Sequence, residues 1–149
     1  MYISKSNENW ISVLHSYFVW GTVKRFGKAL SLLTEEPVMT GGYMNEEIFE
    51  LSLFQHGDIQ AEKTFCEPWT RDDYGFQEEC QNEDYLHQTL DIQNKDKLNG
   101  FISLTSPEQA VNKLSELTNL TIWSDFEWVP YEEYLSNQFE RYEFQINNT

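Results

Sequence analysis

Basic residues are scarce in this sequence. Its 149 residues include 10 lysines and arginines against 25 aspartates and glutamates, which gives a formal net charge of −15 at pH 7. Binding to nucleic acid or to anionic lipid requires clustered Lys and Arg side chains that neutralise phosphate groups. We therefore expect neither nucleic acid nor a membrane as a direct ligand, and a basic protein is the natural electrostatic complement.

Long apolar runs are also absent. The longest fall far short of the ~20 residues needed to span a bilayer, and the first ten residues lack the charged-then-apolar pattern of a signal peptide. Cysteine is rare, and the chain contains two, Cys66 and Cys80. They could pair across a short loop, but a reducing cytosol favours two free thiols. These features predict a cytoplasmic protein.

The sequence contains no signature of a catalytic or cofactor site. GxSxG, glycine-rich phosphate-loop and HExxH motifs are missing, and the three histidines lie far apart without a nucleophile motif nearby. Cys66, Cys80 and His87 lack the CxxC or HxxxH spacing typical of structural zinc sites. The run Asp72-Asp73-Tyr74-Gly75 breaks the alternation of calcium-binding loops. We expect no enzyme activity, metal or cofactor, with a metal-dependent enzyme that uses these acids as the less favoured alternative.

The apolar content is nevertheless sufficient for a core. Hydrophobic residues make up 40% of the chain and aromatic residues 15%, which argues against disorder. Residues 19–33 repeat apolar side chains at spacings of four and three, and Pro37 follows, so we predict a helix that ends before this proline. Its predicted buried face consists of Val19, Val23, Phe26, Leu30 and Leu33.

Strand patterns surround this helix. Residues 49–53 alternate apolar and polar side chains, Gly57 predicts a tight hairpin turn, and Gly41-Gly42 predicts a turn or bulge. Residues 37–66 are therefore predicted to form an antiparallel meander packed on the first helix. We also expect a strand near residues 10–14 and a closing strand near residues 141–146.

Two further helices carry capping signals. Asn82 precedes two acids that suit a positive first turn, and Ser106 precedes Pro107, with Gln109 completing a capping box. A short helix is also expected after Pro130, with Tyr131, Tyr134 and Leu135 on one face. Together these patterns predict a single α+β domain over residues 1–149, an antiparallel sheet with helices packed on one face.

Two stretches combine acidic and aromatic side chains. The first is RDDYGFQEECQNED, residues 71–84, and the second is residues 121–144, which contain eight aromatics and six acids against one arginine. The simplest interpretation places the rings in the core and the acids in water, and it accounts for at least half of them. Surplus Trp and Tyr side chains ringed by carboxylates would instead attract and hold a basic protein. We favour this partner-binding role over a plain solvated loop.

The predicted partner-binding residues are Asp72, Asp73, Tyr74, Glu78, Glu79, Glu83, Asp84, Asp125, Glu127, Trp128, Tyr131 and Glu132.

The order of three segments resembles that in small acidic proteins of Bacillus and related Gram-positive bacteria. The segments are WISVLHSYFVWGTVKRFGKALSLL, PVMTGGYMNEEIFELSLF with a glycine turn after it, and KLSELTNLTIW, within residues 10–123. Some of those proteins resemble immunity proteins of polymorphic toxin systems. The resemblance has no diagnostic motif and transfers no site residues. It implies a cytoplasmic antitoxin that binds one cognate toxin and blocks its active site.

The charge of the chain is compatible with that implication. Nuclease toxins must be basic to hold phosphate, so a strongly acidic inhibitor would suit them. We therefore expect an immunity protein against a basic toxin domain, a nuclease in the first instance. The alternative is a regulatory interaction module whose partner is not a toxin.

Overall fold

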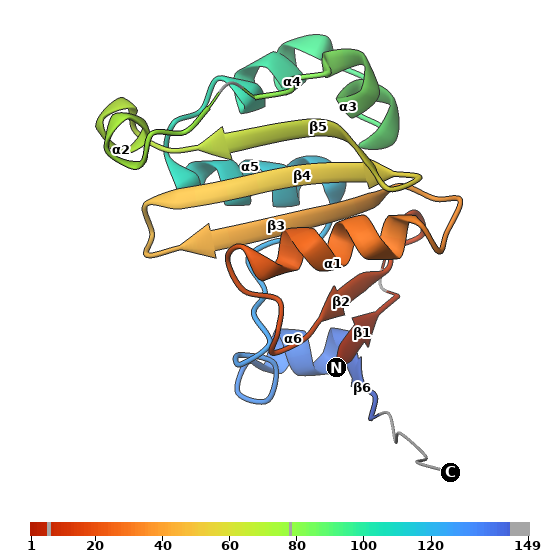
Figure 1. Ribbon diagram of the computed structural model, residues 1–149. Coiled ribbons are helices and arrows are strands. Elements are labelled where there is room, and N and C mark those ends of the chain that lie inside the picture. Colours follow the sequence, from red (N-terminus) through yellow and green to blue (C-terminus); the bar gives the residue numbers. More distant parts are fainter. Residues whose placement is uncertain (6, 78, 144–149) are drawn as a thin grey trace.

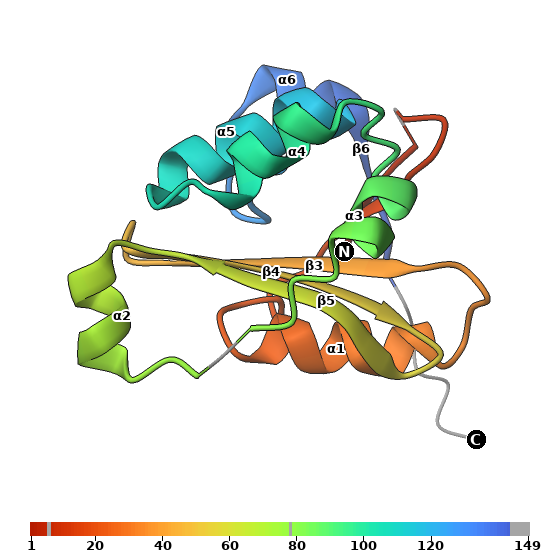
Figure 2. The same cartoon turned by 90° about the horizontal axis from the view of Figure 1, so that it is seen from above.

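The computed structural model describes residues 1–5, 7–77 and 79–143 and has an α+β fold (Figure 1). Its elements are β1 (Tyr2–Ser4), β2 (Ser12–Leu14), α1 (Thr22–Ser31), β3 (Val38–Met44), β4 (Ile48–Gln55), β5 (Asp58–Phe65), α2 (Pro68–Tyr74), α3 (Glu83–Thr89), α4 (Lys95–Ile102), α5 (Pro107–Thr118), α6 (Glu133–Gln138) and β6 (Phe139–Arg141). Two antiparallel three-stranded sheets form, with strand orders β2-β1-β6 and β3-β4-β5. The predicted fold class is confirmed, although helices cover both faces of the meander (Figure 2).

The meander β3-β4-β5 has the predicted connectivity. The turn between β4 and β5 is formed by His56 and Gly57, whose φ angles of 53° and 81° are both left-handed, as a two-residue hairpin turn requires. The turn or bulge expected at Gly41-Gly42 was wrong, because both glycines pair in regular register within β3. Gly42 faces the start of α1, and a Cβ there would be in ordinary van der Waals contact with Trp20 at 3.4 Å and with Val23 at 3.6 Å.

The main core lies between this sheet and α3, α4 and α5 (Figure 2). One face of β4 contributes Phe49, Leu51 and Leu53, as the alternating pattern predicted. Phe65 of β5 lies at the centre, with its ring 5.7 Å from that of Phe49 and 4.9 Å from that of Phe101. Each such buried side chain contributes about 1.5–3 kcal/mol through removal of apolar area from water.

Helix α1 packs on the opposite face of the sheet, but not through its large apolar residues. Gly27 and Ser31 face the sheet and are buried, and a Cβ at Gly27 would clash with Thr40 Cγ2. Phe26 remains 46% exposed and Leu33 84% exposed. The predicted buried face was therefore wrong. The small residues Gly27 and Ser31 let the helix approach the sheet closely, and the large apolar residues Phe26 and Leu33 remain exposed to solvent.

Val19 and Leu30, also predicted on the buried face, are exposed, and Val23 is half-buried.

The capping predictions are confirmed. The Asn82 side chain accepts a hydrogen bond from the Tyr85 amide at the start of α3, and Ser106 accepts one from the Gln109 amide at the start of α5. Helices α2 and α4 were not predicted. The signals were present, since Pro68 opens α2 and Asn94 caps α4.

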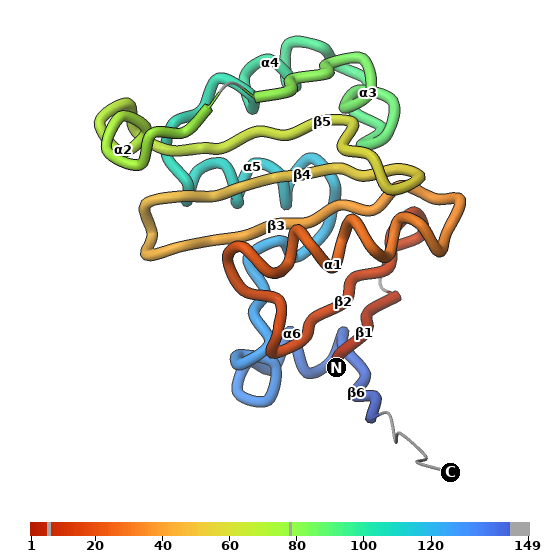
Figure 3. Tube along the Cα trace, in the orientation of Figure 1, coloured from red at the N-terminus to blue at the C-terminus, as the bar shows by residue number. Residues whose placement is uncertain are grey.

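The second sheet joins the two ends of the described chain. β1 pairs with β2 and with β6, and the Tyr142 amide donates to the Met1 carbonyl at 2.8 Å (Figure 3). β2 confirms the strand expected near residues 10–14. The closing strand is Phe139–Arg141, whereas Gln145 and Ile146 lie outside the described residues. Among the described helices, none is long and apolar enough to cross a membrane.

A candidate protein-binding site in the acid–aromatic loop

The structure separates the two acidic stretches. Residues 72–84 occupy the end of α2, the segment after it and the start of α3, whereas residues 125–132 lie in the connection between α5 and α6. α2 and this connection are far apart in both Figure 1 and Figure 2. The predicted residues therefore do not form one continuous surface. Glu78, one of them, lies outside the described residues.

Glu79 is turned inward. Its Oε1 accepts hydrogen bonds from the Thr64 amide at 2.6 Å and from Arg71 at 3.1 Å, and its Oε2 lies 3.1 Å from Lys63 Nζ. Its side chain is 6% exposed. Burial alone would raise the pKa of Glu79, but the Thr64 amide, Lys63 and Arg71 outweigh burial and hold the pKa below its ordinary value. Glu79 therefore stabilises the segment after α2, and we remove it from the candidate site.

The remaining residues of the first stretch form a small patch. Asp72, Asp73 and Tyr74 are exposed on α2, and the Tyr74 ring stacks on Phe76 with centroids 5.5 Å apart. Trp69, which sequence reasoning missed, is exposed beside them.

Glu83 and Asp84 occupy the first turn of α3. There the carboxylates interact favourably with the positive end of the helix dipole. This local structural role explains their position without a partner.

The second stretch forms a compact surface loop. We define residues 121–134 as the acid–aromatic loop. Tyr131 is 90% exposed and Trp128 is 53% exposed, so neither ring belongs to a hydrophobic core. The exposed carboxylates of the loop are Asp125, Glu127, Glu132 and Glu133.

The aromatics of residues 121–144 divide between core and surface, so the simple interpretation holds for only part of them. Trp123, Phe126 and Phe139 are half-buried or buried. Trp128, Tyr131, Tyr134 and Tyr142 are exposed, and Phe144 lies outside the described residues. The expectation that Tyr131, Tyr134 and Leu135 share one face was wrong, since Leu135 alone is buried.

Successive turns give the acid–aromatic loop a defined shape. The Trp128 amide donates to the Asp125 carbonyl, and the Tyr131 and Glu132 amides both donate to the Trp128 carbonyl. The Asp125 side chain accepts a further bond from the Glu127 amide at 2.9 Å. These bonds define the loop backbone from which the two exposed rings project.

The acid–aromatic loop packs against α6 and the second sheet. Val129, Leu135 and Phe139 form a small buried cluster, and the Ser136 hydroxyl donates to the Val129 carbonyl. Phe126 lies 5.3 Å from the Tyr2 ring of β1. The loop is thus built on side chains from both ends of the chain.

The loop has no internal positive charge. Residues 114–140 contain no Lys, Arg or His but include six acids. Within the described part of the chain, none of the four exposed carboxylates of the loop takes part in an ion pair. The residues of the loop therefore add only negative charge to this surface.

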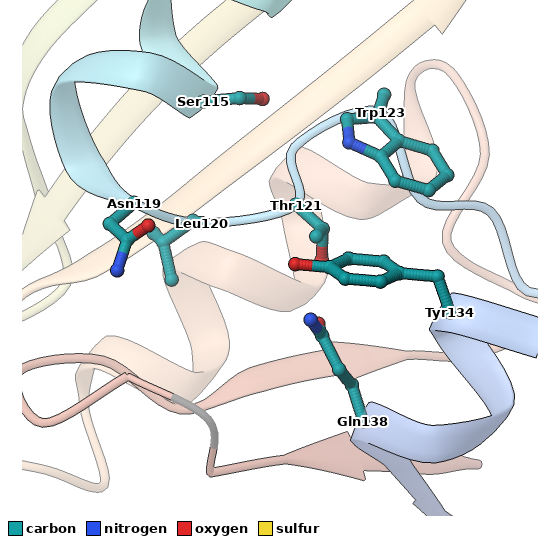
Figure 4. Close-up of a pocket in the computed structure, with 7 residues that line it drawn as sticks. All are labelled: Ser115, Asn119, Leu120, Thr121, Trp123, Tyr134 and Gln138. Atoms are coloured by element: carbon teal, nitrogen blue, oxygen red, sulfur yellow. The ribbon is translucent and has the colours of Figure 1, made fainter.

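A cavity of about 410 Å³ is formed by the end of α5, the acid–aromatic loop and α6 (Figure 4). The Trp123 and Tyr134 rings line it with centroids 6.2 Å apart and an interplanar angle of 25°. The other lining residues are Ser115, Asn119, Leu120, Thr121 and Gln138. Sequence reasoning missed this cavity because its walls come from α5, from the loop and from α6, which are adjacent only after folding.

The rest of the described chain offers little reactive chemistry. No group of three or more His, Cys, Asp or Glu side chains among the residues seen in the structure is placed to hold a metal ion. Both cysteines are free, with Cys66 buried and Cys80 exposed. Burial is the main cause that raises the pKa of the Cys66 thiol, which disfavours the reactive thiolate.

Comparison of the chain with protein-family models, with curated proteins and with solved structures gives no match.

Proposed function

We propose that this protein is an immunity-type inhibitor that binds a basic toxin domain, a nuclease, in the cytoplasm through its acid–aromatic loop. The observation that carries the proposal is the exposure of Trp128 and Tyr131 on a fixed loop among four carboxylates without internal counter-charges. Trp and Tyr are the side chains most enriched at the energetic centres of protein interfaces.

The two kinds of side chain would act at different stages of binding. The net charge of −15 and the carboxylates of the loop attract a basic surface and speed its association. Trp128 and Tyr131 then bury apolar area against the partner and slow its release. Because turns within the loop already define its backbone, less backbone conformational entropy would be lost on binding.

Inhibition would follow from occlusion. A nuclease holds the phosphates of its substrate with clustered Lys and Arg side chains. The exposed carboxylates Asp125, Glu127, Glu132 and Glu133 would take the place of these phosphates. Such an inhibitor needs no catalytic group of its own.

We assign the interface to the acid–aromatic loop rather than to the patch on α2. The α2 patch lies close to Arg71 and Lys63, which bind Glu79 and reduce the local negative field. The loop has no such cation over residues 114–140. The two surfaces can be separated experimentally because each exposes one tryptophan, Trp69 on α2 and Trp128 in the loop.

The test is co-expression with the protein encoded directly upstream. We expect wild-type protein to protect the cells and to form a stable complex with that domain. Trp128→Ser combined with Tyr131→Ser should abolish protection, whereas the matched control Trp69→Ser should retain it. Continued killing with no complex would disprove the proposed function, and loss of protection by Trp69→Ser alone would move the interface to α2.

A further inference from the structure

We infer that the cavity lined by Trp123 and Tyr134 is a receptor for a single arginine side chain of the partner. The inference rests on the proposed function for the identity of the partner, but the cavity and its ligand chemistry can be examined without it. The ligand class is a guanidinium group carried on an apolar stem.

The lining of the cavity fits a donor-rich cation. In Figure 4 the side chains of Asn119, Thr121, Tyr134 and Gln138 are arranged around a common space. Within the described part of the chain, none of these four side chains takes part in a hydrogen bond with another protein group. Their oxygens are free to accept from a ligand, and guanidinium offers five N–H donors in one plane.

The Ser115 hydroxyl, in contrast, already has hydrogen-bond partners within the protein. Its hydroxyl donates to the Val111 carbonyl at 2.9 Å and accepts from the Ile122 amide at 3.2 Å. It therefore fixes the wall of the cavity, and Asn119, Thr121 and Gln138 remain for the ligand.

The electrostatic surroundings favour positive charge. The cavity lies at the C-terminal end of α5, a 12-residue helix whose last carbonyls form the negative end of its dipole. Four exposed carboxylates of the acid–aromatic loop are close in sequence, and residues 114–140 contain no cation that would compete. An anionic ligand would meet an unfavourable field from the C-terminal end of α5.

The aromatic walls favour arginine over lysine. Trp123 packs against both hydrophobic clusters and is a rigid wall, and Tyr134 stacks beside it. A planar guanidinium can lie on an aromatic face while its edge donates hydrogen bonds, whereas an ammonium is a compact, strongly hydrated charge. The apolar stem of arginine would lie along Leu120.

The probe is N-acetyl-arginine amide, titrated into ¹⁵N-labelled full-length protein. We expect a saturable shift of the Trp123 indole N–H resonance in NMR spectra, assigned through Trp123→Phe, with affinity in the millimolar range. The citrulline analogue, which has the same shape without the charge, should produce no saturable shift. The lysine analogue should bind about fivefold more weakly.

Two variants and one control locate the ligand. Tyr134→Leu should weaken arginine binding about fivefold because it removes the stacking ring. Gln138→Glu should strengthen it about fivefold because it adds a carboxylate to the wall. Tyr131→Leu, a more exposed tyrosine outside the cavity, should leave the affinity unchanged. Circular dichroism spectra would show that each variant is folded.

The outcomes separate the inference from the proposed function. The absence of a saturable shift, equal binding of citrulline, or equal losses in Tyr134→Leu and Tyr131→Leu would overturn the arginine receptor. Any of these results together with capture of the toxin domain by wild-type protein would leave the proposed function intact. Binding of the arginine probe without any effect on the toxin would support the receptor and disprove the toxin inhibitor.

Discussion

Gly27 of α1 lies so close to Thr40 of β3 that a β-carbon at position 27 would clash with Thr40 Cγ2. We expect Gly27→Val to lower the free energy of unfolding by about 1–3 kcal/mol, because α1 would have to move away from the sheet. Urea unfolding measures this change. Thr40→Ala in the same background should recover part of the loss because it removes the clashing methyl group.

The matched control is Leu33→Ser, at a larger residue of the apolar stripe. Leu33 is 84% exposed, so its replacement should change the free energy of unfolding by no more than about 0.5 kcal/mol. A larger loss in Leu33→Ser than in Gly27→Val would contradict the packing described for α1.

The Glu79 network predicts a dependence of stability on acid. The pKa of Glu79 is lower in the folded protein than its ordinary value, so the unfolded chain binds more protons as the pH falls. The contribution of Glu79 to the free energy of unfolding is therefore complete above the pKa of the unfolded chain. It is lost as the pH falls through the pKa of the folded protein. Between pH 7 and pH 3, the loss of unfolding free energy should be smaller in Glu79→Gln than in wild-type protein.

The comparison with wild-type protein is needed because the pKa of Glu50 is shifted in the opposite direction to that of Glu79. Burial is the main cause that raises the pKa of Glu50, with Lys24 opposing it, so its contribution to stability decreases as the pH rises. The control is Glu8→Gln, at an exposed residue outside both groups. An equal flattening of the pH profile in Glu8→Gln would disprove the role of Glu79.

The two thiols should react at different rates. Cys80 is exposed, whereas Cys66 is buried and its pKa is raised mainly by that burial. We expect one fast and one slow phase with a thiol reagent at neutral pH. Cys80→Ser should remove the fast phase and leave the slow one. Rapid reaction of both thiols in the folded protein would contradict the burial of Cys66.

Association with a basic partner should depend on salt. Glu127→Gln combined with Glu132→Gln should lower the association rate about threefold at low ionic strength, with a smaller effect on dissociation. The difference should shrink as salt screens the charges. Surface plasmon resonance at low and high NaCl concentrations measures both rates. A change confined to the dissociation rate would place these two carboxylates in direct buried contacts instead.

Local signals in the sequence predicted local structure well. The caps at Asn82 and Ser106, the turn at Gly57 and the alternation of β4 depend on neighbours in the chain, and the structure confirms them. The orientation of α1 depends on which residues the sheet can accept, and a periodic pattern does not contain that information. Small residues at positions 27 and 31 were the signal that could have revealed it.

In the candidate site, too, the local features were predicted from the sequence and the tertiary contacts were not. Its composition, with exposed rings among acids, was predicted from the sequence, and Trp128 and Tyr131 are exposed as that prediction requires. The inward orientation of Glu79 could not be predicted, since its partner Lys63 lies in β5, on the other side of α2 in the chain. The cavity walls likewise come from residues 115–138 and depend on contacts between separate elements.

A three-residue strand connects the ends of the chain to the proposed binding surface. β1 lies between β2 and β6, and its Tyr2 ring packs against Phe126 of the acid–aromatic loop. Deletion of these first few residues would remove the middle strand of the smaller sheet and leave the larger one intact. A shortened chain could therefore keep most of its fold and still lose its partner, and a recombinant tag is better placed where β1 remains free to pair.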